Sequence, residues 1–96
     1  MKELIQNLTE RIYPDKKICI LLKENDEYQE IWNLVRENLN SMGKNYMVYK
    51  SINELNKNII SADSVIFYWN PDLESDLNKL DVCSVNIIER LKILKK

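Results

Sequence analysis

The sequence predicts a small three-layer α/β domain of the flavodoxin-like (Rossmann-like) type, with a mostly parallel four-stranded sheet and helices on both faces. Short apolar runs alternate with helical patterns along the chain, which is the order of a parallel sheet joined by crossover helices. The run at 17–22 is apolar at successive positions, as in a strand covered on both sides. The 96 residues fit one domain, 1–96. We divide it into an amphipathic N-terminal helix (1–13), an alternating core (17–88) and a basic tail (89–96).

The first element is expected to be a helix over residues 2–12. Its apolar side chains recur on one helical stripe, formed by Leu4, Ile5, Leu8 and Ile12. Pro14 disfavours helical geometry in the residue before it, so the helix should stop at Tyr13. The first strand, 17–22, then follows.

The second helix is expected to begin at Asp26, a capping residue with Gln29 three positions later as its capping-box partner. The expected buried stripe consists of Ile31, Leu34, Val35, Leu39 and Met42. Gly43 stands where a left-handed C-terminal cap is favoured. This pattern predicts a helix of about four turns between the first and second strands.

The stretch 45–50 predicts the second strand. Ser51 and Glu54 have the spacing of a capping box, so a short helix should follow. Its inward side chains are expected to be Ile52, Leu55 and Ile59.

The third strand is expected at 65–69, and the polar residues after it match the start of a helix. Asn70 is a capping residue, and Pro71 occupies the first helical position, where a missing N–H costs nothing. Asp72 would complement the positive end of the helix dipole. The inner face of this helix would consist of Leu73, Leu77 and Leu80.

The last segment fits two interpretations. Apolar residues alternate over 82–88, which favours a half-buried edge strand followed by a basic helical tail. Val85, Ile88 and Leu91 also have helical spacing. We adopt the strand over 82–88 and keep the helix as the alternative.

Charge and composition exclude several classes of partner. The net charge is −1, from 14 basic and 15 acidic residues, so direct contact with nucleic acid is not expected. The longest apolar run is about five residues, far below the ~20 that span a bilayer. The N-terminal segment carries Glu3 and Glu10 and lacks the apolar region of a signal peptide. We therefore expect a cytoplasmic protein with no membrane partner.

The residue types present also limit the chemistry. The chain has no histidine, which removes the usual general base and the Ser-His and Cys-His nucleophile pairs. A single glycine excludes the glycine-rich phosphate loops. Cys19 and Cys83 lie in apolar segments and are expected to be buried free thiols. No cofactor is expected, and the balance favours a protein that is not an enzyme.

A candidate ligand site can still be placed at the carboxyl ends of the strands, where open α/β sheets bind ligands. Its polar lining would be Glu24, Asp26, Asn70 and Asp72. Carboxylates after the first strand could hold Mg²⁺ or Ca²⁺. The alternative, which we adopt, is that they are solvated acids at a helix start, so no metal site is assigned.

Acidic residues after the first strand, Glu24 and Asp26, and the turn at Gly43–Tyr46 resemble the response-regulator receiver domains. That family keeps its phospho-accepting Asp at the end of the third strand, where Tyr68 and Trp69 stand here. The resemblance therefore implies a degenerate receiver-like domain and not a working phosphorelay receiver.

Two shorter patterns resemble other families. Cys19 is similar to the nucleophilic Cys on the first strand of cellobiose-type phosphotransferase IIB components, although here it lies in mid-strand. Ala62–Phe67 resembles a strand of nucleoside deoxyribosyltransferase-like and Toll/interleukin-receptor-like domains. The glycine-rich loop of the transferases has no counterpart, so neither pattern implies an active site.

The aromatic residues Tyr28, Trp32 and Trp69 are candidate interface residues, because Trp and Tyr often anchor protein contacts. Core packing and base stacking are the alternatives. Taken together, the sequence favours a non-enzymatic regulatory or protein–protein interaction module of a bacterial or phage cytoplasmic system, acting on a protein partner or on itself. The alternative is a small-ligand or nucleotide-binding protein with its site at the strand ends.

Overall fold

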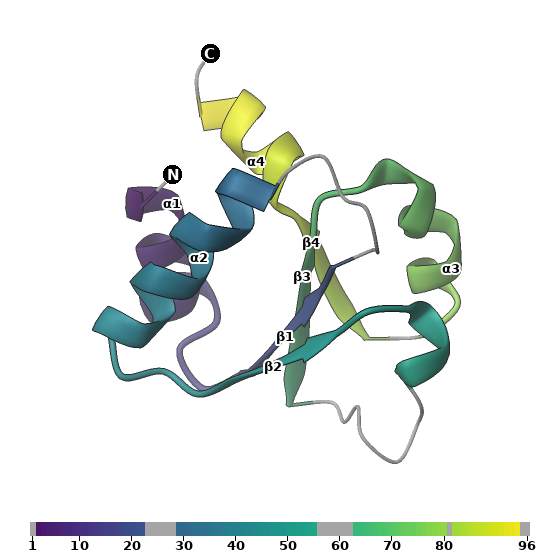
Figure 1. The fold of residues 1–96 in the computed structure, drawn as a ribbon, viewed down its shortest axis with the longest axis horizontal. Helices are drawn as coiled ribbons and strands as arrows, with labels where there is room; N and C mark the ends of the chain where they lie inside the picture. Colours follow the sequence, from purple (N-terminus) through teal and green to yellow (C-terminus); the bar gives the residue numbers. More distant parts are fainter. Residues whose placement is uncertain (1, 23–28, 56–62, 81, 95–96) are drawn as a thin grey trace.

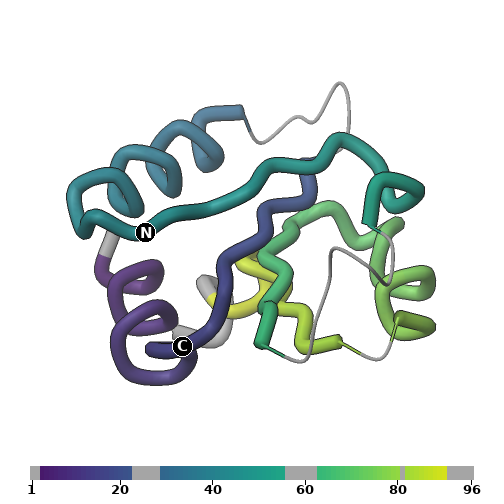
Figure 2. Tube along the Cα trace, turned by 90° about the horizontal axis from the view of Figure 1, so that it is seen from below, coloured from purple at the N-terminus to yellow at the C-terminus, as the bar shows by residue number. Residues whose placement is uncertain are grey.

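The sheet of this protein has four parallel strands in the order β2-β1-β3-β4. The computed structural model describes residues 2–22, 29–55, 63–80 and 82–94. The strands are β1 (Lys17–Leu21), β2 (Tyr46–Tyr49), β3 (Ser64–Tyr68) and β4 (Cys83–Asn86). Figure 2 shows them in this order, from the teal trace of β2 to the yellow-green trace of β4. The order matches the first four strands of the flavodoxin-like fold, so the predicted fold class is confirmed.

Helices lie on both sides of this sheet and complete the three layers (Figure 1). One side, which we call the helix-rich face, carries α1 (Lys2–Asn7), the π-helix η1 (Leu8–Ile12), α2 (Gln29–Ser41) and α4 (Ile87–Leu94). The other side, the thin face, carries only short elements: η2 (Ile52–Glu54), η3 (Pro71–Leu73) and α3 (Glu74–Asn78). None of the helices described here is long and apolar enough to cross a membrane.

Each face has its own hydrophobic cluster, and β3 contributes to both because successive side chains of a strand point to opposite sides. All five residues of β3 are buried, as expected of a central strand. Val65, Phe67 and Trp69 pack on the helix-rich face with Ile5, Leu8, Val35 and Leu39, among others. Ile66 and Tyr68 pack on the thin face with Cys19, Leu21, Leu55 and Leu77.

The N-terminal helix spans residues 2–12 as expected, but its last turn is a π-helix. The N–H of Tyr13 donates to the carbonyl of Leu8, 2.8 Å away, and the Thr9 hydroxyl donates to the carbonyl of Ile5 at 2.9 Å. Thr9 is fully buried, whereas Ile12 is exposed. The prediction that Ile12 completes the buried stripe was wrong, because the wider turn rotates it away from the sheet.

Helix α2 ends where the sequence predicted. Gly43 has φ +69°, and the N–H groups of Gly43 and Lys44 donate to the carbonyls of Asn40 and Leu39 at 3.1 and 3.0 Å, which is a Schellman motif. Leu34 was expected to be buried but is exposed, because the buried side of this helix is formed by Trp32, Val35 and Leu39. The predicted start at Asp26 lies outside the described residues.

The short helix after β2 begins differently from the predicted capping box. The side chain of Ser51 makes no capping hydrogen bond to η2. Instead, a carboxylate oxygen of Glu54 accepts from the backbone N–H of Lys50 at 2.8 Å. Leu55 is buried as expected, and Ile59 lies outside the described residues.

The end of the sheet corrects one prediction. The strand expected over 82–88 is shorter, Cys83–Asn86, and α4 follows it without a loop. The side-chain oxygen of Asn86 accepts from the N–H of Glu89 at 3.1 Å and so caps the helix. Ile87 and Ile88 are therefore helical, and the segment forms a strand followed directly by a helix.

Candidate functional site

The predicted lining of the strand ends is only partly visible. Glu24, Asp26 and Tyr28 lie outside the described residues. The side-chain oxygen of Asn70 accepts from the N–H of Asp72 at 2.9 Å, and Pro71 occupies the first helical position. This is the predicted helix start. Asn70 is half-buried and Asp72 is exposed, so these two residues serve the local cap in this structure.

Trp69 fills the position directly after the central strand. Its side chain is 1% exposed, and its ring stacks on Trp32 with centroids 6.5 Å apart and an interplanar angle of 30°. Trp32 in turn meets Tyr46 edge to face at 6.0 Å. Both tryptophans are thus part of the core and offer almost no surface to a partner. The Nε1–H of Trp69 has no hydrogen-bond partner among the described residues.

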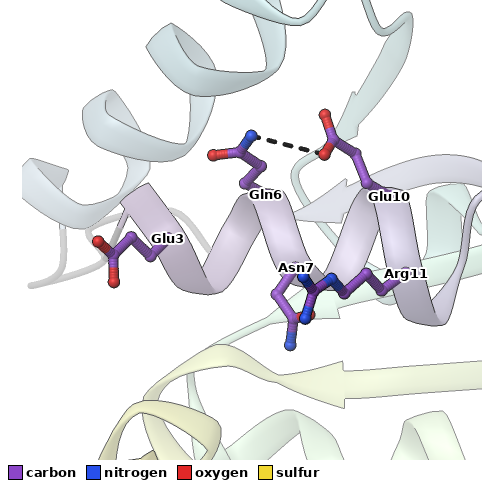
Figure 3. Close-up of a pocket in the computed structure, with 5 residues that line it drawn as sticks. All are labelled: Glu3, Gln6, Asn7, Glu10 and Arg11. Carbon is purple, nitrogen blue, oxygen red and sulfur yellow. Dashed lines mark hydrogen bonds between the residues drawn. The ribbon is translucent and has the colours of Figure 1, made fainter.

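One shallow hollow of ≈ 450 Å³ lies along the outer side of the N-terminal helix. Figure 3 shows its lining, in which Gln6 and Glu10 project from one side of the helix, Asn7 and Arg11 lie on the other, and Glu3 lies at the end. Gln6 Nε2 donates to Glu10 at 3.5 Å, the upper limit for such a bond. No side chain of this lining is buried, so the hollow has no fixed polar group that would select a ligand.

The edge strand β2 is a stronger candidate for an interaction surface. Met47 is 59% exposed and Val48 is 39% exposed. Adjacent residues of a strand point to opposite faces. Tyr46 packs on the helix-rich cluster and Tyr49 on the thin-face cluster, so Val48 lies on the helix-rich side and Met47 on the thin side. This edge therefore exposes one large apolar side chain on each face of the sheet.

The backbone of β2 also has an unpaired side. The carbonyl of Tyr49 accepts from the N–H of Leu22 at 2.9 Å, so Tyr49 and Met47 direct their peptide groups toward β1. Tyr46 and Val48 then direct theirs outward. The N–H of Lys50 also points outward, where it is bonded by Glu54. The outward groups of Tyr46 and Val48 have no hydrogen-bond partner in the described parts of the chain.

A second hollow, which we call the β4 groove, lies on the thin face beside β4. Its volume is ≈ 390 Å³, and its polar lining consists of Tyr68, Glu74, Asn78, Ser84, Asn86, Glu89 and Arg90. Tyr68 lies opposite Asn86 in the β3–β4 pairing, and both point to the side on which α3 lies. Unlike the first hollow, this groove contains buried polar side chains: Tyr68 and Asn86.

Burial and charge hold several acidic groups of the core in their neutral forms. Burial, followed by the nearby carboxylates of Glu74 and Glu89, raises the pKa of Tyr68. Burial also raises the pKa of Cys19 above its ordinary value. Since the thiolate is the reactive form of cysteine, Cys19 is suited to packing and not to nucleophilic attack. Cys83 is free and half-buried. Within the described ranges, no three His, Cys, Asp or Glu side chains are grouped to hold a metal ion.

Comparisons with known proteins add no relative: no family model, no curated protein and no solved structure matches this chain.

Neither the β2 edge nor the β4 groove was predicted from the sequence. One signal for the groove was present, because Asn86 and Glu89 have the spacing of a helix cap and its third helical residue. A helix starting at 87 would have placed Glu89 at the carboxyl end of β4. The exposure of Met47 had no local signal, since it depends on β2 being at the edge.

Proposed function

We propose that this protein is a non-enzymatic interaction module that associates with a second copy of itself through β2. One observation carries the proposal: β2 is an edge strand with unpaired backbone groups and an exposed apolar side chain on each face. Such an edge is a template for pairing with another strand. The strand itself has no charged residue or proline between Tyr46 and Tyr49 to oppose this.

A twofold antiparallel pairing centred on Met47 matches all the outward groups of β2. In this register, Tyr46 lies opposite Val48 of the second copy, and each such pair exchanges two N–H···O bonds. The two symmetric pairs use the outward N–H and carbonyl of both residues. The Lys50 N–H stays bonded to Glu54, so no existing hydrogen bond has to break.

The same register covers the exposed apolar side chains. The two Met47 side chains lie directly opposite each other on the thin face, at a non-hydrogen-bonded position where side chains approach closely. Val48 packs against Tyr46 of the second copy on the helix-rich face. A helix docked on one face would cover only one of these residues, whereas an added strand covers both.

A charge contact limits the strength of this pairing. The register brings Lys44 opposite Lys50 of the second copy, and like charges in facing positions are mildly destabilising. Lys44 is already turned away, because its ammonium group donates to the carbonyl of Pro14 at 3.2 Å. We therefore expect a reversible dimer that is strengthened by salt.

The test is to measure the molar mass by light scattering over protein concentrations around the micromolar range. Val48→Pro removes only an outward N–H, so it should abolish the dimer while the circular dichroism spectrum is retained. Leu34→Gln, which changes an exposed apolar residue on α2, is the matched control and should dimerise like the wild type. A wild-type protein that stays monomeric throughout, or a Val48→Pro variant that dimerises equally well, would contradict the proposal.

A further inference from the structure

We propose that the β4 groove is a binding site for an alkylammonium or guanidinium group. This site goes beyond self-association and does not depend on it, because β4 and β2 lie on opposite edges of the sheet. Three observations support it: a buried tyrosine whose hydroxyl opens into the groove without a hydrogen bond to a described residue, two carboxylates without a described partner, and the hollow that all three line.

The first observation is the hydroxyl of Tyr68. The residue is only 3% exposed, it lines the groove, and its hydroxyl has no hydrogen bond to any part of the chain that the structure describes. Tyr68 Oη is not among the buried polar atoms that lack a partner in the described parts of the chain, so it reaches the open space of the groove. A Tyr hydroxyl that lines a hollow without a hydrogen bond is therefore an open acceptor and donor for a bound group.

The second observation is the charge around this hydroxyl. Glu74, the first residue of α3, and Glu89, in the first turn of α4, come from different elements and both line the groove. Neither carboxylate forms a hydrogen bond or ion pair with a described residue. Burial raises the pKa of Tyr68 most, and the negative charges of Glu74 and Glu89 raise it further.

These groups together favour a cation with several N–H donors. Two carboxylates and a phenol oxygen offer acceptors, and an ammonium has three donors while a guanidinium has five. Hydrogen bonds between such a cation and a carboxylate are among the stronger ones in proteins. An anion would face two carboxylates at close range.

The positive charge of Arg90 determines which cations the groove favours. Arg90 also lines the groove, so its three charged residues sum to −1. Arg90 also acts on Tyr13: burial and the Cys83 thiol raise the pKa of Tyr13, and the positive charge of Arg90 opposes part of that rise. A compact monocation fits this balance better than a long polycation.

The test is a titration of ¹⁵N-labelled full-length protein, followed by NMR shifts of the amides at 74–78 and 84–90. The free probes are the monocations methylguanidinium and butylammonium, and the third probe is a capped Gly-Arg-Gly peptide. Saturable shifts at these amides support the site. Tighter binding of the peptide identifies a protein side chain as the source of the cation, and tighter binding of a free amine identifies a small molecule.

Three variants make this titration decisive. Glu74→Gln and Glu89→Gln should each weaken binding about tenfold, since each removes one charge-assisted hydrogen bond. Tyr68→Phe should weaken it by a smaller factor. Glu37→Gln, an exposed acid on α2, is the control and should change nothing. Equal binding in all variants, shifts spread over every acidic surface, or preferential binding of acetate would overturn the proposal.

Discussion

The two faces of the sheet differ in how they are covered. Three helices, including the 13-residue α2, bury the helix-rich face, and both tryptophans lie there. On the thin face, α3 has five residues and η2 and η3 have three each. Burial of large apolar side chains is the main source of folding free energy, so the helix-rich face contributes most of the stability.

The thin face leaves both edges of the sheet partly uncovered. At one edge Met47 is exposed, and at the other the β4 groove shows Tyr68 and Ser84 between α3 and β4. The helix-rich face therefore supplies most of the packing, while the thin face leaves parts of the edge strands accessible. The β4 groove and Met47 lie on the thin face where the short helices do not reach, whereas Val48 of the β2 edge is exposed on the helix-rich face.

The largest effect on stability is expected from truncating one buried side chain on each face. Trp69→Ala on the helix-rich face should lower the free energy of unfolding by about 3–5 kcal/mol, because it leaves a large cavity beside Trp32. Leu77→Ala on the thin face should cost about 2–3 kcal/mol, since short α3 can move inward and reduce its cavity. Urea denaturation measures both. A larger loss for Leu77→Ala would reverse the comparison.

Trp69→Phe sharpens the same test. The Nε1–H of Trp69 is buried without a hydrogen-bond partner among the described residues, so removing it relieves a penalty of about 1–3 kcal/mol. This gain offsets part of the lost ring area. We expect Trp69→Phe to be much closer to the wild type than Trp69→Ala, and an equal loss in the two variants would show that the indole N–H is satisfied.

Sequence patterns predicted the architecture because apolar spacing distinguishes helices from strands, and a continuous apolar run indicates a strand that is buried on both faces of a sheet. The run at 17–22 indicated a strand buried on two sides, and Gly43 and Asn70 marked a helix end and a helix start. These signals act within a few residues. They were enough to place four strands in a parallel sheet.

The same patterns could not predict the surface. Whether Met47 is exposed depends on which strand lies at the edge, which is a property of the strand order and not of residues 46–49. Trp69 was assigned both to an interface and to the core because an aromatic after a strand suits either. Only its stacking on Trp32, a contact between distant segments, places it in the core.

A smaller effect tests the junction that positions Glu89 in the β4 groove. Asn86→Ala removes the cap of α4 and should lower the free energy of unfolding by about 1 kcal/mol. Asn86→Asp keeps the accepting oxygen and serves as the control, with a loss of a few tenths at most. If Asn86→Ala leaves thermal stability unchanged, the abrupt start of α4 does not depend on this cap.

The smallest effect concerns Tyr68, and it depends on pH. Burial raises the pKa of Tyr68, Tyr49, Tyr13 and Cys19. The folded protein therefore keeps these protons at a pH where the unfolded chain loses them. Because the folded state then binds more protons, stability is fully present below the unfolded values, about 8.5 for Cys and 10 for Tyr, and falls as the pH rises beyond them.

Tyr68→Phe isolates the contribution of the Tyr68 hydroxyl to this loss of stability at high pH. At pH 7 it should change the free energy of unfolding by no more than about 0.5 kcal/mol, because the hydroxyl has no hydrogen bond to lose among the described residues. Above about pH 10 the variant should lose stability less steeply than the wild type. Tyr49→Phe, on the same face but outside the groove, should give a similar relief. Denaturation curves for Tyr68→Phe that parallel the wild type from neutral to alkaline pH would mean that the hydroxyl ionises freely and does not sit between two carboxylates, and the thin face would lose its proposed site for a cation.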